Sequence, residues 1–160
     1  MIGRIWCFGD NISTDDVIAG KYKQSSIDPD QLSKHLMENI RPGFAADIRP
    51  GDFIVAGRNF GCGSSREQAP QIIRHTGIQA VIAISFARIF YRNAINIGLR
   101  LIEADLTGLS EGEALTLEGH RLMSPTRGET WEISGLDPAL DRIIAAGGLL
   151  NLVRQEGTLR

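Results

Sequence analysis

Short apolar runs alternate with amphipathic segments through the middle of the chain. The runs occupy residues 2–8, 52–57, 80–85 and 99–103, and their length and composition are typical of strands. Between them, SSREQAPQIIRHTG has a helix start, body and glycine stop, and FARIFYRNAINIG places apolar residues at helical spacing. The expected core positions of the second helix are Phe86, Ile89, Phe90, Ala94 and Ile97. The alternation predicts an α/β fold.

The segment between the first two apolar runs favours a turn followed by a helix. The first run ends at GDNIST, and the side chains of STDD, residues 13–16, can bond nearby backbone amides. This predicts an ordered turn or a helix cap. Asp30 and the following QLSKHLMENI predict a helix that ends at Arg41-Pro42. The expected positions along one side of this helix are Leu32, His35, Leu36 and Ile40.

The last third of the chain begins with a β-rich pattern. Residues 114–122 predict a hairpin around Glu118-Gly119, and the strand pattern returns at residues 130–133. Residues 137–147 then predict an amphipathic helix, which the pair Gly147-Gly148 ends. Because there is no repeat, low-complexity tract or interdomain linker, residues 1–160 are expected to form one domain.

Composition narrows the class of protein. A chain of 160 residues with 42% hydrophobic content can bury one core. Its 17 basic and 19 acidic residues are interspersed and leave a net charge of -2, which disfavours nucleic acid and anionic membranes as partners. No apolar run approaches the roughly 20 residues of a membrane span, and MIGRIWCFGD lacks the regions of a signal peptide. A soluble, cytoplasmic protein is expected.

The sequence offers no typical metal site. Cys7 and Cys62 are its only cysteines, and they lack a CxxC pairing or a third thiol, so a complete iron-sulfur cluster is not expected on this chain. His35, His75 and His120 are far apart in the sequence, which favours surface or structural roles for each of them.

The segment GRNFGCGSSREQAP, residues 57–70, concentrates the candidate chemistry at a predicted strand-to-helix junction. Gly61 and Gly63 permit close approach of the backbone, and a helix start would direct free N–H groups toward a carboxylate or oxyanion. Arg66 can add a bidentate carboxylate contact, and Ser64 and Ser65 can present hydroxyl groups to the same ligand. These features together predict an anion-binding site.

A purely structural interpretation fits part of the same segment. Ser64 with Glu67, or Ser65 with Gln68, has the spacing of a capping box. A capping box explains one serine, but it does not explain adjacent hydroxyls together with an arginine. From chemistry alone both interpretations stay open. For Cys62 a neutral packing role is favoured over an activated thiolate, because no base is identified beside it.

The segment resembles the GSSRE signature of the swivelling domain in the aconitase superfamily. Its surroundings are similar to small subunits of 3-isopropylmalate dehydratase, through FGDNISTDDVIAGKY, SFARIFYRNAINIGL and DRIIAAGGLLNLV. The resemblance covers nearly the whole chain and implies a swivelling β/β/α domain placed over a separate large subunit. That partner would carry the 4Fe-4S cluster through its own cysteines, and none would be bound here. The implied reaction dehydrates and rehydrates a hydroxy-dicarboxylate.

The resemblance also implies roles for individual residues. Ser64 matches the general base that acts on the substrate carbon, and Ser65 and Arg66 match contacts to the substrate carboxylate or oxyanion. Asp15 matches an active-site aspartate, although the neighbouring Asp16 leaves open which carboxyl group has the expected orientation. One departure is GLRL at residues 98–101, where the family has a proline in place of the arginine.

Substrate choice is expected to depend on residues 22–27, which correspond to the substrate-reading loop of related small subunits. Lys23 can pair with an extra distal carboxylate, as in homoaconitate, although lysines are mostly exposed. Tyr22 and Ile27 can pack a branched alkyl group, as in isopropylmalate or dimethylmalate. The alkyl substrate is favoured, although the loop matches neither the apolar isopropylmalate type nor the arginine-bearing homoaconitase type.

Other functions remain as alternatives. The nearest are the small subunits of homoaconitate hydratase and of 2,3-dimethylmalate dehydratase. An alternative of a different class is a noncatalytic regulatory module that binds anions. The joint presence of Ser64, Ser65, Arg66 and Asp15 favours the enzyme, because a module without catalysis has no chemical need for all of them.

Overall fold

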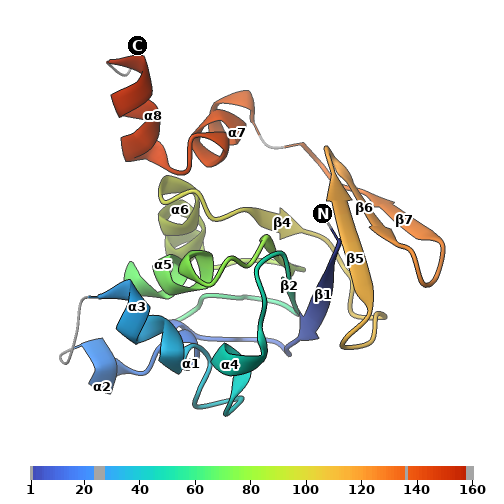
Figure 1. The fold of residues 1–160 in the computed structure, drawn as a ribbon, viewed down its shortest axis with the longest axis horizontal. Helices are drawn as coiled ribbons and strands as arrows, with labels where there is room; N and C mark the ends of the chain where they lie inside the picture. The colour runs from blue at the N-terminus through green and yellow to red at the C-terminus, as the bar shows by residue number, and fades with distance from the viewer. Residues whose placement is uncertain (1, 24–27, 136, 158–160) are drawn as a thin grey trace.

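The computed structural model describes residues 2–23, 28–135 and 137–157, and within them seven strands form one sheet. The strand order is β4-β3-β2-β1-β5-β6-β7 (Figure 1). The strands are β1 (Ile2–Cys7), β2 (Phe53–Ala56), β3 (Ala80–Ala83), β4 (Leu101–Glu103), β5 (Ala114–Glu118), β6 (Arg121–Ser124) and β7 (Glu129–Glu132). Strands β1 to β4 pair in parallel, and β1-β5, β5-β6 and β6-β7 pair antiparallel. The predicted α/β class is confirmed.

The parallel half of the sheet has a buried core on each face. Alternate residues of β2 separate accordingly: Ile54 joins the cluster under the helices, whereas Phe53 and Val55 join a second cluster that includes Leu106 and Leu115. Every residue of β2 and β3 is buried. Continuous apolar runs without polar alternation are typical of parallel strands covered on both faces, which is why the sequence showed compact runs here.

Among the described residues, most of the helices are single turns, and four are longer. The short ones are α1 (Thr14–Val17), α2 (Gly20–Lys23), α3 (Pro29–Leu32), the 3-10 helix η1 (Ser33–His35) and α4 (Phe44–Asp47). The longer ones are α5 (Gln68–His75), α6 (Arg88–Asn96), α7 (Pro138–Ala145) and α8 (Leu149–Glu156). Figure 1 shows α5 and α6 beside each other on one side of the parallel strands. No helix in the described residues is long and apolar enough to cross a membrane.

The core face of α6 is rotated from the predicted one. Phe90 and Ala94 are buried as expected, and Ile95 is also buried. Ile89 was expected in the core, but its side chain is 55% exposed. Residues 90 and 94 are one helical turn apart, and position 89 lies off that stripe, so it faces outward.

The helix predicted from Asp30 to Ile40 is only partly correct. Leu32 and Leu36 are buried, but the helical turns end at His35, and Ile40 is 41% exposed. Met37 is fully buried with φ +56°, and its N–H group donates to the carbonyl of Val17 at 3.0 Å. This contact with α1 diverts the backbone from the helix.

A buried carboxylate joins β1 to the turn before β2. Asp52 accepts hydrogen bonds from the backbone N–H groups of Arg4 and Arg49, each at 3.0 Å, and from Trp6 Nε1 at 2.9 Å. Burial alone would raise the pKa of Asp52, but these hydrogen bonds and that of the Arg4 side chain lower it below its ordinary value. The ionised side chain therefore stabilises the fold.

The β-rich region and the helix over residues 137–147 match the prediction, whereas α8 was not foreseen. Strands β5 and β6 form the expected hairpin, with Leu117 opposite Leu122. The pair Gly147-Gly148 ends α7, but the chain then continues into α8. A Cβ atom added to Gly98 would lie 2.6 Å from the Gly147 carbonyl carbon, so this turn packs tightly on the end of α6.

Candidate active site

Two loops lie together at the carboxyl ends of β1 and β2. The N–H group of Gly61 donates to the carbonyl of Ile12 at 2.7 Å, and the N–H group of Thr14 donates to the carbonyl of Cys62 at 2.8 Å. The Thr14 hydroxyl donates to the carbonyl of Ser64 at 2.8 Å. Ligands of α/β proteins bind beyond the carboxyl ends of parallel strands. The two motifs singled out in the sequence, near residues 14 and 64, therefore meet where a site is expected.

Glycine is needed at two positions of the second loop, though for different reasons. Gly61 has φ +83°, and an added Cβ would lie 2.2 Å from Phe90 Cγ, so its close approach is to α6 and not to a ligand. Gly63 has φ +92°, and an added Cβ would make only ordinary van der Waals contacts, with Thr14 Oγ1 at 3.6 Å and Ser13 Cβ at 3.7 Å. Glycine at position 63 is therefore required by its positive φ, and its predicted close approach to a ligand stays a prediction.

The helix begins later than the sequence indicated. α5 begins at Gln68, and its N-cap residue Glu67 makes no capping hydrogen bond with its side chain. Neither predicted capping box forms, so the structural explanation for Ser64 or Ser65 is wrong. Both serines lie exposed in the loop before the helix. Within the described residues, the backbone N–H groups of residues 63–66 donate no hydrogen bond to the protein, which leaves them available to an anion.

Arg66 is held in place by the first turn after β1. Its Nη1 atom lies 2.5 Å from Asp15 Oδ1 and donates to the carbonyl of Ile18 at 2.9 Å. The Arg66 side chain is 15% exposed and that of Asp15 is 57% exposed. Gly20 leaves room for this arrangement, since a Cβ there would lie 3.3 Å from Arg66 Nη2. Two predicted site residues, distant in sequence, are therefore in direct contact.

Asp16, the acidic neighbour of Asp15, caps a helix and forms no ion pair with Arg66. Asp16 Oδ2 accepts from the Ser13 N–H group at 2.8 Å, and the Asp16 N–H group donates to Ser13 Oγ at 3.1 Å. This reciprocal pair is a capping box at the start of α1. The predicted helix cap in STDD is confirmed, and Asp15 is the acid that faces Arg66.

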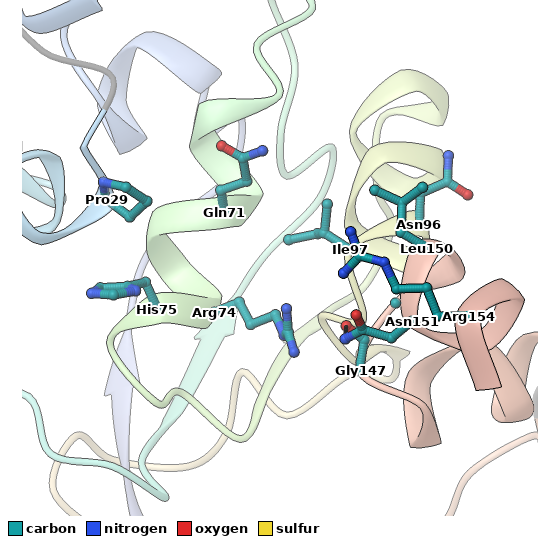
Figure 2. A pocket seen from close by; sticks show the side chains of 11 residues that line it. Pro29, Gln71, Arg74, His75, Asn96, Ile97, Gly147, Leu150, Asn151 and Arg154 are labelled. Atoms are coloured by element: carbon teal, nitrogen blue, oxygen red, sulfur yellow. Dashed lines mark hydrogen bonds between the residues drawn. The ribbon is translucent and has the colours of Figure 1, made fainter.

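A cavity of about 390 Å³ adjoins the loop. Its lining combines Thr14, Gly61, Gly63, Ser64, Ser65 and Arg66 with Ala87, Arg88, Ile89, Phe90 and Asn93. The residues contributed by the start of α6 were not predicted as site residues. The resemblance of SFARIFYRNAINIGL to a family motif could have indicated that this segment contributes to the site. The helical spacing of its apolar residues indicated only a helix that packs on the core. A larger cavity of about 710 Å³ lies elsewhere, between α5, α6 and α8 (Figure 2).

The predicted substrate-reading loop is only partly described. Tyr22 Oη donates to Glu38 Oε1 at 2.8 Å, and its ring stacks on His35 with 3.8 Å between centroids. The hydrogen bonds from His35 and Tyr22 lower the pKa of Glu38. Tyr22 does not line the cavity of Ser64. Ile27 and the Lys23 side chain lie outside the described residues, so their expected roles stay predictions.

The two cysteines, Cys7 and Cys62, are both free and do not form a disulfide with each other. Cys62 Sγ lies 3.5 Å from the carbonyl of Asn11, and Cys7 Sγ lies 3.8 Å from that of Leu109. In the described part of the chain, no group of three or more His, Cys, Asp or Glu residues is placed to hold a metal ion. The donor set of this chain does not fit an iron-sulfur cluster.

Comparisons with known proteins identify the family of the chain. Residues 10–105 match the family described as the aconitase C-terminal domain. The chain is 48% identical over 156 residues to 3-isopropylmalate dehydratase small subunit 1 of Archaeoglobus fulgidus, with 96% of each chain covered. It is also 48% identical over 150 residues to the methanogen homoaconitase small subunit of Methanothermobacter thermautotrophicus, covering 93% of this chain and 88% of that relative.

A solved structure has the same fold. A crystal structure of 3-isopropylmalate dehydratase from Methanocaldococcus jannaschii matches with a TM-score of 0.91 at 43% identity, and covers 98% of this chain and 96% of that chain. The family match, the named relatives and the shared fold identify the chain as a subunit of an aconitase-type hydro-lyase. The chain belongs to the aconitase C-terminal domain family, within it to the small subunits of the 3-isopropylmalate dehydratase type. The expected swivelling-domain fold is confirmed.

Proposed function

We propose that residues 1–160 act as one swivel domain that completes the active site of a cytoplasmic hetero-oligomeric dehydratase. Its partner is a large subunit that carries a 4Fe-4S cluster, and the reaction interconverts 2- and 3-isopropylmalate by dehydration and rehydration. The relatives are named as small subunits, which supports a large-subunit partner. The chain would thereby serve the biosynthesis of leucine.

The observation that carries this proposal is the anchored guanidinium group of Arg66. Nη1 is used by Asp15 and Ile18, whereas Nε and Nη2 make no hydrogen bond within the described residues. That free edge has the geometry for a bidentate contact with a carboxylate. Since Arg66 lines the cavity with Ser64 and Ser65, a substrate carboxylate on Arg66 would lie beside two hydroxyl groups.

Ser64 acts as the base in this proposal. Its alkoxide takes a proton from the substrate carbon, a carbon–carbon double bond forms as the adjacent carbon–oxygen bond breaks, and the hydroxyl group leaves as hydroxide, which a proton from solvent converts to water. Ser64 is left as a neutral hydroxyl and returns its proton to solvent; rehydration reverses these steps, with the hydroxyl group added to the neighbouring carbon. The partner's cluster would supply Lewis-acid polarisation of the leaving hydroxyl. A serine hydroxyl is a weak base at neutral pH, so its charged form needs stabilisation. Arg66 and the backbone N–H groups of residues 63–66 can stabilise the alkoxide. These N–H groups lie in the loop before α5 and donate no hydrogen bond to the described part of the protein.

A second substrate class is favoured by one specific comparison. The identity to the methanogen homoaconitase small subunit equals that to the dehydratase small subunit from Archaeoglobus fulgidus. Homoaconitate carries an extra distal carboxylate, for which Lys23 is the candidate partner. The shared part of both substrates would contact Ser64, Ser65 and Arg66, so the site residues serve either reaction.

The test is anaerobic reconstitution with the large subunit encoded nearest to this chain, followed by assays on isopropylmalate, dimethylmalate and homoaconitate. We expect cluster and activity only in the complex, with the highest kcat/KM for isopropylmalate. Iron and sulfide analysis of the isolated chain is the control. Activity of the chain alone, or a complex inactive on all hydroxy-dicarboxylates, would refute the proposal. A higher kcat/KM for homoaconitate would make homoaconitate, and not isopropylmalate, the proposed substrate.

A further inference from the structure

A second cavity lies at the far ends of the helices that begin near the candidate active site. It has a volume of about 710 Å³ and lies where the C-terminal ends of α5 and α6 meet α8 (Figure 2). The described residues that line it are all different from those around Ser64. The eight residues of α5 span about 12 Å along the helix axis, which separates the cavities. A ligand here would not share the substrate's site.

Two arginines from different helices give the cavity its charge. Figure 2 shows the guanidinium groups of Arg74, from α5, and Arg154, from α8, directed toward one another. Neither arginine takes part in an ion pair among the described residues. No described residue of the lining is acidic. At the rim, His75 already pairs with Asp30, at 2.6 Å. The cationic groups therefore face the cavity without a matching anion from this part of the chain.

Uncharged hydrogen-bond donors around the cavity also favour an anion. The N-cap of α8 is Gly148, which has no side chain, and the first backbone N–H group bonded within this turn is that of Leu152, to Gly148. The three preceding N–H groups of α8 remain without a helical partner. Gln71 and Asn96 add amide side chains to the lining. Stabilising the C-terminal ends of α5 and α8 could explain an arginine in each last turn, but that role does not require both to face one cavity.

We propose that this cavity binds a small organic dianion. Carboxylate or phosphate groups would contact Arg74 and Arg154, because both oxyanions match the guanidinium geometry. An apolar portion would lie against Ile97 and Leu150, whose side chain is 73% exposed at the edge of the cavity. The volume falls within the range of small-molecule sites. Nothing in the proposed reaction uses these residues, so the site is independent of it.

The test is titration calorimetry of the full chain with succinate and with inorganic phosphate, at constant ionic strength. Arg74→Gln and Arg154→Gln should each weaken binding about 10-fold, the size expected for one lost charge-assisted contact. Arg49→Gln removes the same charge from an exposed arginine outside both cavities, and Arg66→Gln disables the candidate active site. Both controls should retain the parent affinity. Circular dichroism verifies that each variant is folded.

The outcomes separate the alternatives. Tighter binding of succinate or of phosphate identifies the carboxylate or the phosphate class as the ligand, and either result supports the site. Equal weakening in all four variants would mean nonspecific attraction, and weakening in Arg66→Gln alone would place the anion at the active site; each overturns the proposal. Repeating the titration in the complex with the large subunit adds a last condition. Binding that disappears there would mean that the cavity is a subunit interface, and would also overturn it.

Discussion

Replacing Arg66 by lysine tests the candidate site most directly. The substitution keeps the positive charge but removes the planar guanidinium group, which can donate two parallel hydrogen bonds to a carboxylate. The substitution should lower kcat/KM by about 10- to 150-fold. This range corresponds to one lost hydrogen bond to a charged group, about 1.5–3 kcal/mol. An ammonium group can still approach Asp15, but it cannot hold that carboxylate, the Ile18 carbonyl and a substrate carboxylate in one plane.

The same substitution should affect folding much less. Asp15 is 57% exposed, so its ion pair with Arg66 contributes about 0–1 kcal/mol, and the melting temperature should fall by only a few degrees. The assay measures kcat and KM in the reconstituted complex alongside thermal unfolding of the chain. Arg58→Lys, at an exposed position outside the cavity, is the matched control. If kcat/KM stays within about twofold of the parent, or if loss of assembly accounts for the whole decrease, Arg66 does not bind substrate.

Three further variants test other parts of the structure. Ser64→Ala should lower kcat by roughly 100-fold or more while leaving unfolding unchanged, since its hydroxyl caps no helix; near-parent turnover would remove Ser64 as the base. Ser13→Ala should cost about 1 kcal/mol of unfolding free energy through the lost cap of α1, measured by urea denaturation; an unchanged midpoint would contradict it. Asp52→Ala should cost about 3 kcal/mol, because Trp6 Nε1 loses its buried acceptor. The hydrogen bonds to Asp52 hold its native pKa below the unfolded value, so its contribution is complete above the unfolded pKa and is lost as pH falls through the native pKa. Asp52→Asn should lack this acid dependence, and an unaltered pH profile would refute the assignment.

The parts of the fold fixed by local pattern could be predicted, and those fixed by tertiary contacts could not. The buried strands and the hairpin followed from apolar runs and turn residues. The early end of the helix near His35 depends on a bond from Met37 to Val17, which no local pattern encodes. The late start of α5 was not predicted either, since the loop before it makes contacts such as that of Arg66 Nη1 with the Ile18 carbonyl, which join residues far apart in the sequence.

The candidate site shows the same division. Motif resemblance found Ser64, Ser65 and Arg66, but only the fold brings Arg66 to Asp15 and gives Asp16 a separate capping role. The lining of the cavity by residues of α6 was not predicted from the sequence. Helical periodicity identifies the buried side of a helix, but it does not indicate which residues of the first turn border a cavity.

The position of β1 in the sheet has a consequence for how the chain folds. This strand pairs with β2 through Ile5–Cys7 and with β5 through Ile2–Arg4, so it joins the parallel and antiparallel halves. It is synthesised before both neighbours, and β5 follows only at residues 114–118. The centre of the sheet therefore depends on contacts between distant parts of the sequence, which slow folding. Until β5 emerges from the ribosome, one edge of β1 stays open to pairing with other chains.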